Sequence, residues 1–169
     1  GPPPPKAGPA PTTPTGAALR VRGLHVVVGD RTLLHPMDLE VARGTLVGIA
    51  GPSGAGKSTL LTALGGLHRG ARGRVEHEEA TRVGFVPQDD IVHRDLGLRR
   101  TLEHGARLRL PIATSEERRR AVQHVLSLLD LVDVADVRVG DLSGGQRKRA
   151  SLATELLSDP TLLLLDEPT

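Results

Sequence analysis

The segment 51–59, GPSGAGKST, constrains the fold more than any other feature of the chain. It fits the pattern G-x-x-x-x-G-K-[ST], which belongs between a strand and a helix. The run 45–50, TLVGIA, is short, apolar and β-branched, as in a buried strand, and 58–64, STLLTAL, favours a helix that Gly65 and Gly66 close. The sequence therefore predicts a strand–loop–helix unit of an α/β fold. The alternative is a glycine-rich turn that only caps a helix.

The residue types of this segment suit the binding of phosphate groups. Glycines let the backbone curl so that successive N–H groups point inward, and the following helix presents its positive N-terminal end to the same anion. Lys57 can reach the β- and γ-phosphates of a nucleotide, and the Ser58 hydroxyl can ligate Mg²⁺. The candidate ATP-binding residues are Gly51, Ser53, Gly54, Ala55, Gly56, Lys57, Ser58 and Thr59.

The last eight residues, LLLLDEPT at 162–169, supply a second part of such a site. Four leucines predict a strand buried on both faces, and two carboxylates follow at its carboxyl edge, where open α/β sheets place their ligands. Asp166 is suited to hold Mg²⁺ through its water shell, and Glu167 to orient or deprotonate an attacking water. A solvated acidic turn is the alternative, and the presence of Lys57 favours the functional interpretation.

A third segment, LSGGQ at 142–146, narrows the class. With the other two, it makes the chain resemble the nucleotide-binding domain of ATP-binding-cassette (ABC) proteins, from about Leu19 to the C-terminus. The resemblance implies that Ser143, Gly144, Gly145 and Gln146 contact the γ-phosphate of an ATP held by a second copy of the domain, in a head-to-tail dimer. Ser143 is also an apt N-cap, and two glycines permit close backbone approach. Taken alone, Ser-Gly-Gly would be only a turn that starts a helix.

The resemblance adds a fourth element. The run 83–88, VGFVPQ, is similar to a strand followed by the Q-loop of the family, in which Gln88 would contact Mg²⁺ or the attacking water and relay nucleotide state to the transport domain. The segment 85–111 further resembles the G subfamily of ABC transporters and related bacterial ABC proteins. Asp89, Asp90 and the LRLP sequence at 108–111 carry that finer similarity.

The implied fold is α/β: a P-loop NTPase (RecA-like) core with an antiparallel β layer and a helical signature subdomain. Residues 1–17, rich in Pro, Thr and Gly, are typical of a disordered linker, and 18–169 form a partial ABC ATPase domain. Within it we expect the β layer at 18–44, the core at 45–90 and 150–169, and the helical subdomain at 91–149. In the β layer, short alternating runs are broken by Gly23 and by Gly29-Asp30.

Two helices of the subdomain can be outlined from their patterns. A capping box at 114–117 precedes an apolar stripe, and a second amphipathic helix follows Gly144. The inward residues are Val122, Val125, Leu126 and Leu129 in the first helix and Ala150, Ala153, Leu156 and Leu157 in the second. The arginine runs at 118–120 and 147–149 are interpreted as solvated faces, although Arg147 and Arg149 would add positive potential beside the signature.

Composition excludes several functions. The absence of Cys excludes disulfides and thiol chemistry, and the seven His residues lack a metal-ligand pattern, so no His-bound metal is expected. A net charge of +2 and a single aromatic residue, one Phe, argue against nucleic acid as a partner. No apolar stretch approaches the roughly 20 residues that span a bilayer, and no signal peptide is present, so a transporter's membrane part would lie elsewhere.

Two departures from the family pattern matter. The family commonly stacks adenine on an aromatic residue, whereas the corresponding run here, 26–29, is VVVG, so adenine would rest on aliphatic surface such as Val28. The chain also stops at Thr169, before the family's D-loop and switch histidine. We therefore expect a sheet that lacks a strand and a chain that alone has little or no activity.

The expected function is binding and hydrolysis of Mg-ATP to power translocation, with export favoured by the G-subfamily likeness, at the cytoplasmic face of a membrane. Expected partners are a second copy of the domain or a paralogue and a transmembrane domain C-terminal on the same chain. The proline-rich start and the missing initiator Met leave room for an upstream regulatory domain. A soluble ABC ATPase that acts on the ribosome or DNA is the main alternative, and a nucleotide-sensing interaction module is a third.

Overall fold

The first part of the chain folds into a three-stranded antiparallel sheet. The computed structural model describes residues 16–78, 81–88 and 92–166. Strands β1 (Ala17–Val28), β2 (Arg31–Ala42) and β3 (Ala71–His77) lie in the order β2-β1-β3. Gly29, at φ 58°, makes the β1–β2 turn. The antiparallel layer is confirmed, and β3 joins it from a range expected to belong to the core.

A bulge at Gly23 explains how β1 keeps one face buried from Leu19 to Val26. Leu19 and Val21 are buried before the bulge, and Leu24 and Val26 after it, so the buried positions change from odd to even numbers. Gly23 has φ 57°, and the pairing of β1 with β2 shifts register between Val21 and Leu24. Because side chains alternate along a strand, one extra residue is needed to return the apolar set to the same face.

Helix α1 (Lys57–Leu64) closes this sheet lobe, defined here as residues 16–78. Its Leu60, Leu61, Ala63 and Leu64 are buried in one cluster with the inner face of β1. The predicted helix after the phosphate loop is thus confirmed, and Gly65 is its C-cap. Leu164 from the end of the chain joins the same cluster.

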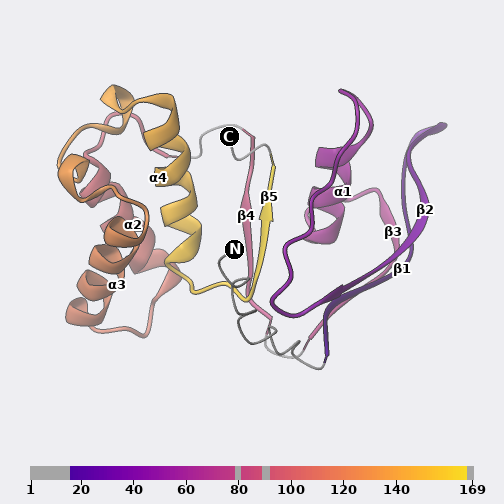
Figure 1. Cartoon of the computed structure of the whole chain (residues 1–169), viewed down its shortest axis with the longest axis horizontal. Coiled ribbons are helices and arrows are strands. Elements are labelled where there is room, and N and C mark those ends of the chain that lie inside the picture. Colours follow the sequence, from indigo (N-terminus) through magenta and orange to yellow (C-terminus); the bar gives the residue numbers. More distant parts are fainter. Residues whose placement is uncertain (1–15, 79–80, 89–91, 167–169) are drawn as a thin grey trace, which may run out of the picture.

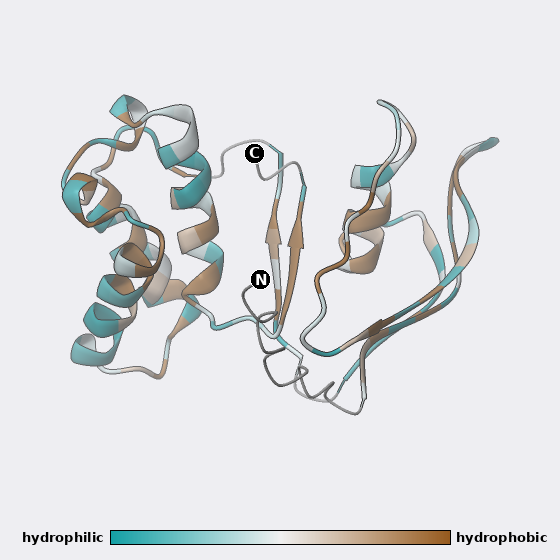
Figure 2. Ribbon diagram, viewed as in Figure 1, coloured by the Kyte–Doolittle hydropathy of each residue, from teal (hydrophilic) through white to brown (hydrophobic). Residues whose placement is uncertain are grey.

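Two parallel strands lie between the sheet lobe and the helices of the second half of the chain (Figure 1). Strands β4 (Val83–Val86) and β5 (Leu162–Leu165) pair in register from Val83 with Leu162 to Val86 with Leu165. Both strands are mainly hydrophobic in Figure 2. The strands expected before Gln88 and Asp166 are confirmed, although Leu164 alone of the four leucines is fully buried.

The prediction of a strand at 45–50 is wrong. These residues adopt no regular structure, and Leu46, Val47 and Ile49 are 97%, 51% and 38% exposed. A strand forms only where a neighbour completes its backbone hydrogen bonds. Among the described residues no strand pairs with 45–50, so no ladder is completed there.

The helical lobe, residues 92–157, has its own core. It contains α2 (Leu98–Arg109), α3 (Ser115–Leu128) and α4 (Gly144–Leu156), with the 3-10 turns η1 (Val132–Val134) and η2 (Val139–Asp141). Its largest fully buried side chains are Leu98, Leu102, Leu126, Leu131 and Val139. Figure 2 shows hydrophilic residues on the outer surfaces of these helices.

Both predicted helix patterns of this lobe are confirmed. Thr114 caps α3 in a capping box with Glu117, and Val122, Val125 and Leu126 are buried while Leu129 packs against the core. On α4, Ala150 and Ala153 are buried and Leu156 is partly buried, and Leu157, the C-cap, is buried as well.

The arginines at 118–120 are bound locally: Arg118 donates to the Leu110 carbonyl at 3.1 Å, and Arg119 and Arg120 lie 3.1 and 4.0 Å from Glu116. Within the described ranges, none of the helices is both long enough and apolar enough to span a bilayer.

Candidate functional site

The loop before α1 has the backbone conformation that phosphate binding needs. Gly54 and Gly56 have φ values of 78° and 88°, which only glycine adopts without strain. Ala55 N–H donates to the Pro52 carbonyl at 3.2 Å, which closes a turn. Gly56 is the N-cap of α1, and no side chain caps the helix there. The N–H groups of the first helical turn therefore face an exposed loop, as an anion site requires.

Lys57 bridges the two ends of this loop. Its Nζ donates to the carbonyl oxygens of Gly51 and Pro52 at 3.0 and 2.9 Å. Because an ammonium has three donors, these two bonds leave one for a further acceptor. Ser58 is exposed on the first turn of α1, and its neighbour Thr59 is half-buried.

Asp166 continues the end of β5. It is only 7% exposed, and its N–H donates to the Val86 carbonyl at 2.9 Å, which extends the parallel ladder by one residue. The phosphate loop and the carboxyl end of β5 lie at the same end of the molecule (Figure 1). Glu167, the predicted base, lies outside the described residues.

The signature residues open helix α4. Ser143 is the N-cap, as predicted: its Oγ accepts from Gln146 N–H at 3.3 Å, and its N–H donates to Gln146 Oε1 at 2.9 Å. The reciprocal role of Gln146 was foreseeable from the S-x-x-Q spacing but was not part of our sequence interpretation. A Cβ on Gly144 would meet no atom within 4 Å, and one on Gly145 would meet only Arg149 Nη1, at 3.9 Å.

Gln88 follows β4 and is exposed. Its carbonyl oxygen accepts a hydrogen bond from Lys148 Nζ on α4. Asp89 and Asp90, which carry part of the G-subfamily likeness, lie outside the described residues. The position assigned to adenine is apolar and open, since Val27 and Val28 are 41% and 53% exposed.

Sequence reasoning missed a buried ion pair beside β4. Arg109 of α2 donates through both terminal guanidinium nitrogens to Glu155 of α4: Nη1 to Oε2 at 3.2 Å, and Nη2 to Oε1. The Glu155 side chain is 7% exposed and that of Arg109 31%. Neither residue belongs to a sequence motif, so the ion pair can be recognised only from the folded structure.

The donor set fits a magnesium nucleotide. The loop offers backbone N–H groups and an ammonium to phosphates, and Ser58 and Asp166 offer the hard oxygens that Mg²⁺ prefers. Among residues 16–78, 81–88 and 92–166, no cluster of three His, Cys, Asp or Glu could hold a metal.

A glycine-rich loop that ends on an uncapped helix, beside a parallel strand that ends in a buried aspartate, places the chain among the P-loop nucleotide-binding proteins. The family profile described as ABC transporter matches residues 34–169, and the chain belongs to that family. It is an ATP-binding domain of the ABC type, a class of ATPases.

Related proteins agree with this assignment. The chain is 45% identical over 163 residues to ABC transporter ATP-binding/permease protein Rv1747 of Mycobacterium tuberculosis, covering 89% of the chain and 19% of that protein. It is 40% identical over 155 residues to ABC transporter G family member 25 of Arabidopsis thaliana, covering 83% and 23%. These matches support the G-subfamily and bacterial likeness, and the chain spans about a fifth of each relative's length.

A solved structure confirms the fold class. An inward-facing conformation of a putative metal-chelate type ABC transporter superposes with a TM-score of 0.77 at 30% identity, over 90% of this chain and 60% of that one. None of the relatives described here is a soluble ATPase that acts on the ribosome or DNA, so that alternative gains no support.

Proposed function

We propose that this domain binds Mg-ATP and, paired head to tail with a second copy or a paralogue, hydrolyses it to drive export across a membrane. The observation that carries the proposal is the placement of the N-termini of two helices, α1 and α4. The phosphate loop lies on α1 and the signature on α4, on opposite sides of the β4–β5 pair (Figure 1). This arrangement supports contact of the signature with the nucleotide of another copy.

Within one copy, the phosphate loop holds the nucleotide. Backbone N–H groups of 51–59 and the Lys57 ammonium bind the phosphates, and Ser58, Gln88 and Asp166 hold the metal. Bound Mg²⁺ would supply charge neutralisation at the transferring phosphate. Glu167 orients the attacking water and takes its proton. Lys57 and the signature of the other copy stabilise the charge that develops in the transition state.

The glycines of the signature support a role outside the fold of this chain. Open space surrounds the Cβ positions of Gly144 and Gly145, and neither has the positive φ that would demand glycine. Packing within this chain therefore does not require glycine at these two positions. The close approach of a group from outside the chain would explain why both are glycine. The γ-phosphate of the second copy's ATP is the group that we assign there.

Adenine rests on aliphatic surface at Val28. We expect weak base selectivity, because no aromatic ring is present at 26–29 to stack on the base. Titration with fluorescent analogues of ATP and GTP measures this base selectivity. Affinities that differ by a large factor would contradict this assignment.

The partners follow from the relatives. The name ATP-binding/permease protein joins both activities in one polypeptide, which supports a transmembrane domain on the same chain as this domain. We place that domain C-terminal because of the G-subfamily likeness. The domain would then lie at the cytoplasmic face of the membrane, with residues 1–17 as a linker to an upstream regulatory domain. The boundaries at 18–44, 45–90 with 150–169, and 91–149 are part of this proposal.

The decisive experiment measures steady-state hydrolysis of Mg-ATP by the longest polypeptide that the gene encodes around this chain, over a range of protein concentrations. A matched Glu167→Gln protein is measured beside it. A rate that rises more steeply than linearly with protein concentration, and that the substitution abolishes, supports the two-site dimer and the base. A linear rate that is insensitive to Glu167 contradicts both.

A further inference from the structure

Helix α4 lies along the edge of β4 that β5 leaves open (Figure 1). In a parallel ladder, alternate residues turn their backbone groups to opposite edges of the strand. The Arg82 carbonyl accepts a hydrogen bond from Leu162 of β5, and the Val86 carbonyl accepts one from Asp166, which follows β5. The backbone groups of Phe85 therefore face the other edge. That edge needs partners from outside the sheet.

Glu155 supplies one of these partners. Phe85 N–H donates to Glu155 Oε2 at 3.4 Å, and the same carboxylate is held on its other side by Arg109. The Glu155 side chain is 7% exposed, so the contact is shielded from water. One carboxylate thus joins α2, α4 and β4.

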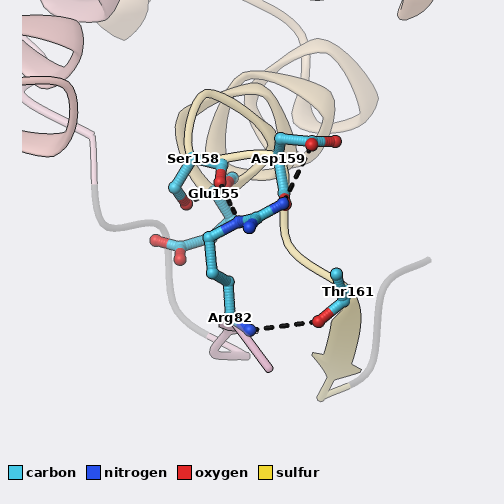
Figure 3. A network of polar contacts seen from close by, with 5 residues as sticks. All are labelled: Arg82, Glu155, Ser158, Asp159 and Thr161. Atoms are coloured by element: carbon cyan, nitrogen blue, oxygen red, sulfur yellow. Dashed lines mark hydrogen bonds and ion pairs between the residues drawn. The ribbon is translucent and has the colours of Figure 1, made fainter. Parts of the chain in front are cut away.

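Two further contacts join α4, or the residues directly after it, to the residues that flank β4. At the far end, Lys148 Nζ donates to the Gln88 carbonyl. At the near end, Arg82 Nε donates to the carbonyls of Ser158 and Asp159 at 3.1 and 2.8 Å (Figure 3). We call the three contacts, made by Lys148, Glu155 and Arg82, the α4–β4 seam.

The seam connects two parts of the proposed site. Helix α4 begins at Ser143 and β4 leads to Gln88, so a fixed register between helix and strand fixes these two residues relative to each other. Glu155 is the buried member of the seam, whereas the Arg82–Asp159 ion pair is 51% and 95% exposed. An acceptor lost from a buried contact leaves an unpaired N–H, so the strand must shift or admit water.

We infer that Glu155 is a positioning residue for ATP hydrolysis, which holds Gln88 in register with the signature helix through the Phe85 N–H. The inference rests on the proposed function. Glu155 does not touch the nucleotide; it acts through β4. Its removal therefore lowers turnover and leaves ATP binding to the phosphate loop unchanged.

Two substitutions separate the hydrogen-bond acceptor from the charge. Glu155→Gln keeps an oxygen that can accept from Phe85 N–H, and Glu155→Met keeps the length but has no such oxygen. In the longest encoded polypeptide, we expect Glu155→Met to lower kcat at least about tenfold, because small misplacements of a catalytic group have effects of this size. Glu155→Gln should stay within about threefold of wild type, and KM for ATP should change in neither protein.

The matched control is Asp159→Asn, which removes the exposed ion pair between Arg82 Nη2 and Asp159 Oδ2 beside the seam. Arg82 keeps its two carbonyl acceptors, and Asn tolerates the φ of 47° at this position. Its kcat should equal that of wild type. Amide hydrogen exchange at Phe85 gives a readout that does not depend on hydrolysis: it should be faster in Glu155→Met and unchanged in Asp159→Asn.

A double variant, Arg109→Met with Glu155→Met, guards against simple destabilisation, because replacing both members of a buried pair by apolar groups commonly restores stability. A low kcat in a stable double variant supports the inference. Recovery of kcat in the double variant, or an unchanged kcat in Glu155→Met, overturns it while the proposed function stands. A wild-type protein that does not hydrolyse ATP overturns the proposed function and this inference together.

Discussion

The helical lobe and the phosphate loop of the sheet lobe are held in shape by different means. In the helical lobe, Leu98, Leu102 and Leu126 are 0% exposed, and the helices bury one another. In the loop segment, Leu46 is 97% exposed and every residue from 51 to 55 is exposed. The helical lobe is therefore shaped by apolar packing, and the loop by glycine backbone angles and the hydrogen bonds of Lys57.

The largest expected effect tests this contrast with one substitution type in each region. Leu126→Ala should lower the free energy of unfolding by about 2–5 kcal/mol, because it leaves a cavity in a packed core. Leu46→Ala should change it by less than about 0.5 kcal/mol, because the side chain lies in solvent. Denaturant unfolding followed by circular dichroism measures both. Equal losses would mean that 45–50 is buried in solution.

Lys57 offers the next largest effect. Lys57→Met should weaken ATP binding about 10- to 100-fold, since hydrogen bonds to charged groups contribute roughly 1.5–3 kcal/mol. Arg119→Met, in the helical lobe, is the control and should leave the affinity unchanged. Titration with a fluorescent ATP analogue measures both proteins. If the two variants bind alike, Lys57 does not contact the phosphates.

Glycines of the two regions should respond differently to the same change. Gly54→Ala should destabilise the chain by about 1–2 kcal/mol, because φ is 78° there. Gly144→Ala should leave stability unchanged or raise it by up to about 1 kcal/mol, because the position is helical and its Cβ site is open. Thermal unfolding measures both variants. A Gly144→Ala protein that is less stable would show that packing, and not a ligand, explains that glycine.

The smallest expected effect concerns pH and the helical lobe alone. Hydrogen bonds from the Thr114 N–H, and then from its hydroxyl, hold the pKa of Glu117 below its ordinary value of 4.5. A carboxyl group whose pKa is lowered in the folded state stabilises the fold at pH values above its unfolded-state pKa. This contribution is lost as the pH falls through the folded-state pKa. Wild type should therefore lose more stability than Glu117→Gln as pH falls below 4.5. Parallel unfolding curves in acid would contradict this role.

Local signals in the sequence predicted much of the fold. The helix after the phosphate loop, the strands at 83–86 and 162–165, and both helix caps depend on short-range patterns, and all are present. The strand at 45–50 was predicted wrongly because a strand also depends on a neighbour, which no local pattern supplies. The third strand of the sheet, β3, was missed because its sequence, ARGRVEH, is largely polar.

The residues of the candidate site show the same difference between local patterns and tertiary contacts. Motif residues such as Lys57, Ser143 and Asp166 could be proposed from the sequence because they lie in contiguous, recognisable segments. Arg109 and Glu155 were not, because 46 positions separate them and a charged residue within a helix is ordinarily solvated. Their burial and their contact with β4 arise only when α2 and α4 pack together.

The bonds from Lys57 to its own loop have a consequence for chemical labelling. With its ammonium donating to two carbonyls, the Lys57 nitrogen is held close to the backbone, and these bonds must break before an acylating reagent can reach it. A nucleotide bound as proposed would compete for the same protons, and Lys57 would then exchange carbonyl oxygens for phosphate oxygens. The reactivity of this single amine would therefore report which oxygens it faces at any moment.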